Sequence, residues 1–300
     1  MLKIGVLGIG MISQKAYLPV MAMMQDEVEW HLSTRNKDVL HQVAAKYGMT
    51  HIHFTVESLL KSGIQAVFIH AATSVHDSLI KIFLEEGIHV YVDKPISENL
   101  DKTKELLKLA EQKGVLLTCG FNRRFAPLVQ QLKPIPNKEM IFIQKDRIQG
   151  KKKSRYAIYD LFLHLVDTAL FLLDDPVERM DSHIISEKGI LKRAWMILET
   201  KQTSCIVTMN YEAGANREIM EVQSVGGIHR VIDLNEAEIL QEGTQRKITF
   251  PDWEPTLNKR GFAPLIHQFV ESIQTGLNPV SSASALASHE LCEKILESDC

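Results

Sequence analysis

Over its first 121 residues the chain alternates short apolar runs with segments of helical apolar spacing. The runs predict buried strands, and the periodic segments predict helices. Nearly continuous apolar strands separated by helices are typical of a parallel sheet covered on both faces, so a doubly wound Rossmann domain is predicted. The expected strands cover 3–7, 28–33, 66–71, 88–92 and 115–119, and the expected helices cover 12–24, 38–47, 74–86 and a stretch from a cap at Asn99 or Asp101 to Gly114.

The pattern changes after residue 121. Runs that alternate apolar and polar residues are typical of an antiparallel sheet with one wet face. Such runs cover 193–199, 204–211, 219–225 and 229–234, and helices are expected over 156–173, 264–275 and 283–296. We therefore expect an α/β chain of two domains. Residues 1–121 form a dinucleotide-binding Rossmann domain, and residues 122–300 form an α+β domain with an open, mainly antiparallel sheet for substrate binding and oligomerisation.

A glycine loop connects the first predicted strand to the first predicted helix. Gly8, Gly10 and Ser13 match G-x-G-x-x-G/A except for Ser in the last place, where helix–strand packing needs a small side chain. The first glycine makes a tight turn and the second admits a pyrophosphate. Free N–H groups at the helix start, at Met11 and Ile12, can bind that group. This context favours a nicotinamide dinucleotide as cofactor, and a tight turn without a ligand is the alternative.

The end of the second predicted strand bears on which nicotinamide cofactor is used. NAD-binding domains carry an acidic residue there that binds the ribose hydroxyls. This chain instead has Ser33, Thr34 and Arg35, whose hydroxyls and guanidinium suit a 2′-phosphate. We therefore expect NADP(H) to be preferred, with NAD(H) as the alternative.

Charge and composition narrow the choice of partners and compartment. The chain has 34 Lys and Arg against 37 Asp and Glu, a net charge of −3, which gives no reason to expect nucleic acid or an anionic membrane. No apolar stretch reaches the roughly 18 residues of a membrane span, and the first apolar run is too short for a signal peptide. Cys119, Cys205, Cys292 and Cys300 have no C-x-x-C or zinc spacing, so we expect reduced thiols, a cytoplasmic location and no metal site.

Three segments resemble the Gfo/Idh/MocA family of glucose–fructose oxidoreductase, inositol dehydrogenase and their relatives. Residues 87–95 resemble its G-K-H-V-x-x-E-K-P signature, with Asp93 in place of Glu. Residues 120–125 resemble the stretch that crosses between its domains. Residues 160–167 are similar to its D-x-G-x-H-x-x-D helix, with Phe162 in place of Gly. Within the family, the chain resembles members labelled virulence factor MviM, a label that implies no chemistry.

The resemblance covers the chain to residue 175. It implies a Rossmann domain followed by an α/β domain with an open, largely antiparallel sheet. It also implies hydride transfer between nicotinamide and a carbinol carbon of a sugar, polyol or related compound. Because family members are commonly homo-oligomers that pack through the second sheet, we expect a homodimer or homotetramer.

Hydride transfer from an alcohol needs a base for the hydroxyl proton and a donor that stabilises the oxygen. Asp160 and His164 are four residues apart on a predicted helix and share a face. We predict that His164 is the general acid–base, because the pKa of His lies near working pH, and that Asp160 orients it or binds a substrate hydroxyl. Lys94 follows a predicted strand, where ligands bind in α/β sheets, and is expected to hydrogen-bond the reacting oxygen. A surface ion pair or helix cap is the alternative for each residue.

Weaker signals add further cofactor residues. Thr73 and His76 follow a predicted strand, where a nicotinamide ribose can sit, and a capping or core histidine is the alternative for His76. Asp93 and Lys94 are expected at the cofactor as well. The sequence does not decide whether Pro95 follows a cis peptide bond.

Three residues are candidate substrate contacts: Arg123, Tyr156 and Asp167. For Arg123 a bridge between the domains is favoured over a phosphate contact, and for Tyr156 core packing is the default. Two other functions stay open, a cofactor-bound regulatory protein without turnover and a redox-neutral glycoside-processing enzyme that retains its cofactor. The joint presence of Lys94 and His164 with Asp160 argues against the regulatory alternative.

Overall fold

A computed structural model describes residues 1–297 and divides the chain into two compact units. The first unit comprises residues 1–120 and 262–286, and the second comprises 121–261 together with the residues from Ala287 onward. Residues 262–286 therefore pack with the first unit, although a single boundary near residue 121 assigns them to the second.

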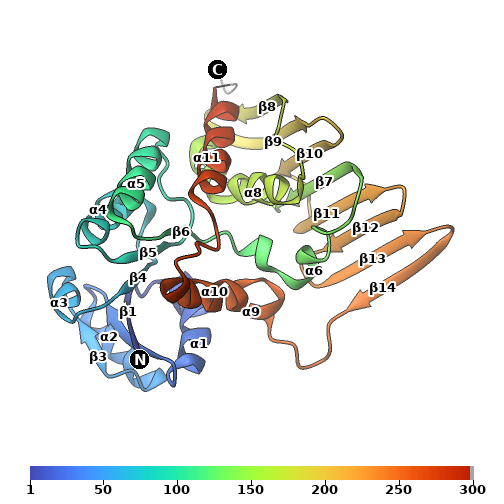
Figure 1. Ribbon diagram of the computed structural model, residues 1–300. Coiled ribbons are helices and arrows are strands. Elements are labelled where there is room, and N and C mark those ends of the chain that lie inside the picture. The colour runs from blue at the N-terminus through green and yellow to red at the C-terminus, as the bar shows by residue number, and fades with distance from the viewer. Residues whose placement is uncertain (298–300) are drawn as a thin grey trace. The chain divides into compact units, whose positions relative to one another are not determined.

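The first unit contains a six-stranded parallel sheet in the order β3-β2-β1-β4-β5-β6 (Figure 1). This is the order of a Rossmann fold. The central strand β4 is fully buried along its length, as expected of a parallel strand covered on both faces. The strands are β1 (Leu2–Leu7), β2 (Val28–Ser33), β3 (His51–His53), β4 (Ala66–Ile69), β5 (His89–Val92) and β6 (Leu117–Cys119).

Short-range sequence signals set the helix ends in this unit. The Asn36 side chain caps α2 by accepting from the N–H of Val39, and Asn99 rather than Asp101 caps α5. The helices are η1 (Ser13–Tyr17, a π-helix), α1 (Leu18–Met21), η2 (Ala22–Met24), α2 (Lys37–Tyr47), α3 (Val56–Lys61), η3 (Thr73–Val75), α4 (His76–Glu85), α5 (Leu100–Lys113) and α10 (Phe262–Thr275). Figure 1 shows α4 and α5 side by side next to β5, in agreement with their contacts.

Aromatic packing explains why α10 belongs to the first unit. The ring of Phe269 lies edge-on to Phe68 of β4 and Tyr91 of β5, with centroids 5.0 and 5.4 Å apart. Phe262 contacts Tyr17 in the same manner at 5.4 Å. Each buried aromatic ring removes a large apolar area from water, so the first unit is completed by a helix from the far end of the sequence.

The second unit contains an eight-stranded sheet in the order β14-β13-β12-β11-β7-β10-β9-β8. Only β7 and β10 pair in parallel, and the other neighbours are antiparallel. The predicted fold class is thus confirmed in both units. The strands are β7 (Lys138–Asp146), β8 (Arg179–Glu187), β9 (Ile190–Glu199), β10 (Ser204–Asn210), β11 (Arg217–Ser224), β12 (Gly227–Ile232), β13 (Glu236–Gln241) and β14 (Thr244–Thr249).

One face of this sheet is covered by a helical stretch that runs across β7 and β10 (Figure 1). The sequence predicts one helix over 156–173, and the structure has α7 (Ser154–Ala157), the π-helix η5 (Ile158–Phe162) and α8 (Leu163–Leu172) in continuous succession. Almost every residue of α8 is buried. The remaining helices are η4 (Asn122–Phe125), α6 (Pro127–Gln130), α9 (Thr256–Lys259) and α11 (Ser282–Leu296), the last of which begins in the first unit.

The described cysteines are reduced. Cys119, Cys205 and Cys292 are buried and form no disulfide, and Cys300 lies outside the described residues. Within residues 1–297 no helix combines the length and apolarity needed to cross a bilayer.

Candidate active site

The glycine loop after β1 lies tightly against the neighbouring strands. Gly8 has a φ of +95°, which L side chains rarely adopt. Its N–H donates to the carbonyl oxygen of Ser33 at 2.9 Å. A Cβ at Gly8 would lie 2.7 Å from the backbone nitrogen of Ala71, so only glycine permits this approach between the ends of β1 and β4.

Replacing Gly8 with alanine is expected to weaken dinucleotide binding and to destabilise the protein. The strain of an alanine at this φ is about 1–3 kcal/mol, which corresponds to roughly tenfold or more in a dissociation constant if relief displaces the loop. The measurement is a fluorescence titration with NADPH. Gly114→Ala is the control, because Gly114 also has positive φ but a Cβ there meets nothing within 4 Å. Equal affinity in the two variants would contradict the assignment of the loop.

Gly10 lies beside open space, whereas Gly8 is packed against the backbone of Ala71. A Cβ at Gly10 meets nothing within 4 Å, and helical structure begins at the next residue, so a phosphate can approach the N–H groups of the first turn. Met11 is 84% exposed and Ile12 39%. Since neither side chain has a hydrogen-bond donor for a phosphate, the donors at these two positions are their backbone N–H groups. Ser13 is fully buried, as the third position of the motif requires.

A cavity of about 590 Å³ opens at this loop. It brings together four of the residues predicted for the cofactor, namely Gly8, Gly10, Thr34 and Arg35. It also contains residues that the sequence did not indicate, among them Asn36, Val39, Val56, His70 and Val75. No Asp or Glu is found among its described lining residues. Apolar walls, open backbone and one guanidinium fit a dinucleotide with an adenine and a pyrophosphate.

His70 is the main cavity residue that sequence reasoning missed. Both ring nitrogens are buried without a hydrogen-bond partner among residues 1–297, and the ring lies on Tyr17 with centroids 3.9 Å apart. Burial, with a smaller effect of His76, lowers the pKa of His70 to about 3, so the ring is neutral at physiological pH. Its position directly after a buried strand is the signal that could have identified it.

Ser33 and His76 have structural roles beside this cavity. Ser33 is buried and supplies the carbonyl that accepts from Gly8. The buried ring of His76 contacts the carbonyl oxygens of Pro95 and Ala71 at 2.8 and 3.1 Å, and therefore joins the turn after β4 to the turn after β5. Thr73 lies in a separate small hollow formed with Asp77, Ser97 and neighbours.

The turn after β5 carries Asp93 and Lys94. The carboxylate of Asp93 accepts from the backbone N–H of Lys94 at 2.8 Å, which fixes the start of the turn. The Lys94–Pro95 peptide bond is cis, which answers the question left open by the sequence. Lys94 follows the carboxyl end of its strand, as predicted.

In the second unit, Asp160 and His164 lie on one helical stretch. Asp160 is half-buried within η5, and His164 is buried near the start of α8, where its carbonyl accepts from the Thr168 hydroxyl at 2.7 Å. Burial first, and the negative charge of Asp160 second, raise the pKa of the Tyr211 phenol. A π-turn inside a helix is rare and is frequent at functional sites.

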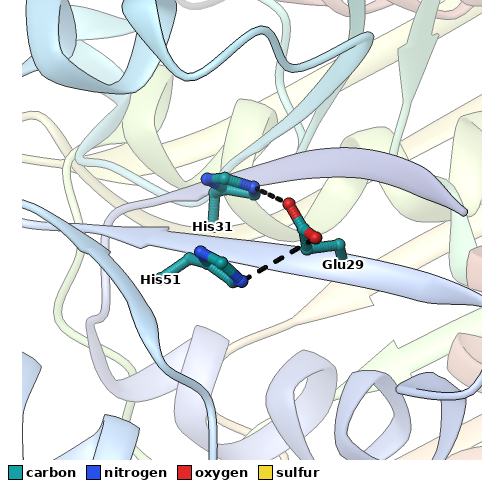
Figure 2. A group of neighbouring side chains, drawn as sticks. All are labelled: Glu29, His31 and His51. Carbon is teal, nitrogen blue, oxygen red and sulfur yellow. Dashed lines mark hydrogen bonds and ion pairs between the residues drawn. The ribbon is translucent and has the colours of Figure 1, made fainter.

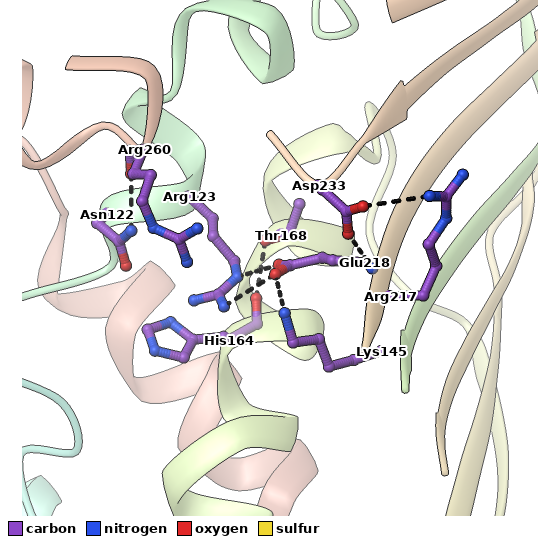
Figure 3. A network of polar contacts seen from close by, with 9 residues as sticks. All are labelled: Asn122, Arg123, Lys145, His164, Thr168, Arg217, Glu218, Asp233 and Arg260. Carbon is purple, nitrogen blue, oxygen red and sulfur yellow. Dashed lines mark hydrogen bonds and ion pairs between the residues drawn. The ribbon is translucent and has the colours of Figure 1, made fainter. Parts of the chain in front are cut away.

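A buried charge network surrounds this stretch (Figure 3). Arg123 and Lys145 both donate to the carboxylate of Glu218, and the backbone N–H of Glu218 donates to Asp233 at 2.7 Å. Burial alone would raise the pKa of Glu218, but Arg123 and Lys145 outweigh it and lower the pKa to about 2. Arg260 lies beside the network, where its carbonyl oxygen accepts from the Asn122 side chain at 2.7 Å. Burial, and then the charge of Arg123, lower the pKa of Arg260.

The three candidate substrate residues differ in their surroundings. The bonds of Arg123 to Glu218 lie within the second unit. Asp167 is fully buried, accepts from Arg124 with both carboxylate oxygens and accepts from Ser288 at 3.3 Å. Tyr156 is 41% exposed, with the Lys152 ammonium 5.0 Å from its ring centroid. Glu218 and Lys145 were not predicted as site residues, because charged residues on alternating strands usually face water.

Comparison with known proteins gives the family. A family described as Oxidoreductase family, NAD-binding Rossmann fold matches residues 2–121, and one described as YceM-like, C-terminal domain matches residues 127–242. YceM of Salmonella typhimurium, a protein whose name assigns it to the oxidoreductases, is 32% identical over 286 residues, 93% of this chain and 91% of that protein. The chain belongs to the Gfo/Idh/MocA oxidoreductase family.

Other Gfo/Idh/MocA similarities extend over most of the chain. A solved dehydrogenase, MviM from Clostridium difficile, has a TM-score of 0.93 at 29% identity and covers 99% of both chains. Myo-inositol 2-dehydrogenase of Thermotoga maritima is 23% identical over 228 residues, 71% of this chain and 66% of that protein. As a Gfo/Idh/MocA member the chain is an oxidoreductase whose Rossmann unit binds a nicotinamide cofactor, which confirms the predicted enzyme class.

Proposed function

We propose that the chain is an NADP(H)-preferring dehydrogenase that transfers a hydride between nicotinamide and a carbinol or carbonyl carbon of a sugar, polyol or sugar derivative. The observation that carries the proposal is the cavity at the glycine loop, where Thr34 and Arg35 replace the acidic residue of NAD-binding domains. A guanidinium binds a phosphate through several N–H groups, whereas a carboxylate would repel it.

The chemistry needs an acid–base group that works near neutral pH. A bound nicotinamide supplies the hydride acceptor for oxidation and the donor for reduction. His164 takes the hydroxyl proton in oxidation and returns it in reduction, and Asp160 orients His164 or binds a substrate hydroxyl. Lys94 donates a hydrogen bond to the reacting oxygen and stabilises the charge that develops there. The π-turn at Asp160 and the burial of His164 support this assignment.

The substrate class rests on relatives and on charge. Myo-inositol 2-dehydrogenase of Thermotoga maritima is named for a polyol. Around Glu218 the cations Arg123, Lys145, Arg217 and Arg260 outnumber the two carboxylates, Glu218 and Asp233. In Figure 3 the Arg123 and Arg260 guanidiniums and the His164 ring point toward the same side. The excess of positive charge favours a substrate with an anionic substituent, so sugar acids belong in the first substrate screen beside neutral polyols.

Assembly through the second sheet is part of the proposal. Phe142, Ile197 and Ile206 lie at paired positions on neighbouring strands and are half-buried. Their neighbours along the strands are fully buried beneath α8, so these three face the other side. An apolar patch of this kind supports a homodimer or homotetramer.

Cofactor choice is tested by titrating the protein with NADPH and NADH. Wild type is expected to bind NADPH more tightly, and Arg35→Ala is expected to weaken NADPH about tenfold, or roughly 1.4 kcal/mol, while it leaves NADH nearly unchanged. Lys37→Ala is the charge-matched control, because Lys37 is exposed near the same loop but does not line the cavity. A clear NADH preference in wild type would refute the NADP(H) proposal, and no saturable binding of either would refute a working cofactor site.

A further inference from the structure

Four side chains that can bind a metal share one face of the Rossmann sheet. Glu29 and His31 are two residues apart on β2, and His51 and His53 are two residues apart on the edge strand β3. The parallel register pairs His31 with His51. Because side chains alternate along a strand, all four point to the same side, and they are called here the His–Glu cluster.

Three members of the His–Glu cluster converge on one point (Figure 2). Nε2 of His31 lies 2.8 Å from one carboxylate oxygen of Glu29, and Nε2 of His51 lies 3.8 Å from the other. The three ligand atoms all lie within 4.8 Å of one another. Zinc holds imidazole nitrogen and carboxylate oxygen at about 2.0–2.2 Å, so the ligand atoms of a tetrahedral site are roughly 3.3–3.6 Å apart. This separation lies between the 2.8 and 3.8 Å that join Glu29 to the two histidines.

We infer that Glu29, His31 and His51 bind one divalent transition-metal ion, of which zinc(II) is the best match. Imidazole and carboxylate ligands suit this class of ion. A set of three protein ligands leaves the fourth tetrahedral position to water. The inference is independent of the proposed dehydrogenase activity.

His53 and Ser58 hold His31 in the orientation that a ligand needs. Nδ1 of His31 lies 3.0 Å from Nε2 of His53, and Nδ1 of His53 lies 3.0 Å from the Ser58 hydroxyl. With the metal on Nε2 of His31, its Nδ1–H donates to His53, whose Nδ1–H donates to Ser58. Each ring nitrogen of His31 and His53 then either binds the metal, donates one hydrogen bond or accepts one. A hydrogen bond of this kind fixes the tautomer of a metal-binding histidine.

Burial differs among the ligands in a way that permits entry. The side chain of His31 is 4% exposed, that of Glu29 28% and that of His51 47%. The buried ligands are therefore preorganised, and His51 is free to adjust its ring toward an incoming ion. The Lys3 ammonium contacts the cluster, 3.6 Å from Glu29, and its 46% exposed side chain can turn to solvent when the ion arrives.

A bound ion would fasten the edge of the sheet. β3 is only three residues long, and its register with β2 consists of three residue pairs. The ion would link the two strands at the His31–His51 pair, where this short ladder begins. Since Thr34 follows β2 and Val56 follows β3, and both line the cofactor cavity, the ion would also stiffen one wall of that cavity.

The test is calorimetric titration of the tag-free full chain with zinc chloride after removal of metal by a chelator. One saturable site per chain is expected for wild type. His51→Ala and Glu29→Gln are each expected to weaken zinc binding about tenfold or more, and Ser58→Ala less, as for outer-shell partners. His267→Ala is the matched control, because His267 is an exposed histidine of the same unit outside the cluster, and it is expected to bind as wild type does.

Titration of wild type with cobalt(II) gives a second readout that needs no variant. Tetrahedral coordination produces intense visible absorption, which is expected at one equivalent and is expected to be displaced by zinc. Absence of saturable zinc binding to wild type overturns the inference. Equal loss of affinity in His51→Ala and His267→Ala also overturns it, because adventitious surface histidines would then account for the binding.

Discussion

Replacing His164 with alanine is expected to lower kcat about 10²–10⁴-fold, the usual contribution of a positioned general acid–base. The reason is that the only other titratable side chain that the structure describes on α8, Asp167, is buried in its ion pair with Arg124 and so cannot replace the imidazole. The measurement is the rate of NADPH formation with the best substrate from a screen of sugars, polyols and sugar acids.

Cofactor affinity is the control for this variant. The dinucleotide cavity is formed by first-unit residues, so His164→Ala is expected to bind NADPH as wild type does. Asp160→Asn is expected to shift the pH profile of kcat and to reduce kcat less than His164→Ala, as a positioning role requires. Undiminished turnover in His164→Ala would remove His164 from the mechanism while leaving the cofactor assignment intact.

Loss of the Glu218 carboxylate is expected to be the most destabilising single polar substitution in the second unit. Glu218→Gln leaves the buried cations Arg123 and Lys145 without their shared counter-ion. Breaking a buried ion pair from one side costs about 3–5 kcal/mol. Urea unfolding measures the free energy of unfolding. Glu236→Gln serves as control because its partner Lys247 is exposed and Glu236 is only half-buried, and such a pair contributes at most about 1 kcal/mol.

Wild type and Glu218→Gln also differ in how their stability depends on pH, in a direction that the pKa of Glu218 defines. The pKa of Glu218 is about 2 in the folded protein and near 4.3 in an unfolded chain, so its stabilisation is complete above the unfolded value. It is expected to be lost as the pH falls from about 4.3 toward 2, and the stability difference between wild type and Glu218→Gln should shrink over that interval. A difference that does not change with pH would show that the carboxylate is not held ionised by its partners.

The Rossmann unit was largely predictable because its signals are local. Continuous apolar strands, the glycine loop and the Asn36 cap each depend on a few neighbouring residues. The strand β3 was missed, since His51 and His53 surround a single Ile and carry no apolar run. The location of α10 was not predictable either, because its apolar face is compatible with any core, and only the fit of Phe269 onto Phe68 and Tyr91 decides which one.

The candidate site was predictable in part for the same reason. Gly8, Gly10, Thr34 and Arg35 lie together at the cavity because a strand–turn–helix unit fixes their geometry. Buried ion pairs between distant segments leave no such local pattern. Arg123 was identified only as a bridge or phosphate ligand, whereas its partner Glu218 stands 95 residues away. The His–Glu cluster was invisible for the related reason that it needs the pairing of β2 with the unpredicted β3.

The return of residues 262–286 to the first unit has a consequence for biosynthesis. A chain emerging from the ribosome presents its N-terminal residues first, and β1 to β6 can pair as soon as they are out. The side of Phe68 and Tyr91 that Phe269 covers, however, remains open until Phe269 has been translated, after the whole second sheet. The nascent Rossmann unit therefore keeps an apolar surface open to chaperones while residues 121–261 are synthesised, and the cofactor-binding unit reaches its native core only after α10 has been made.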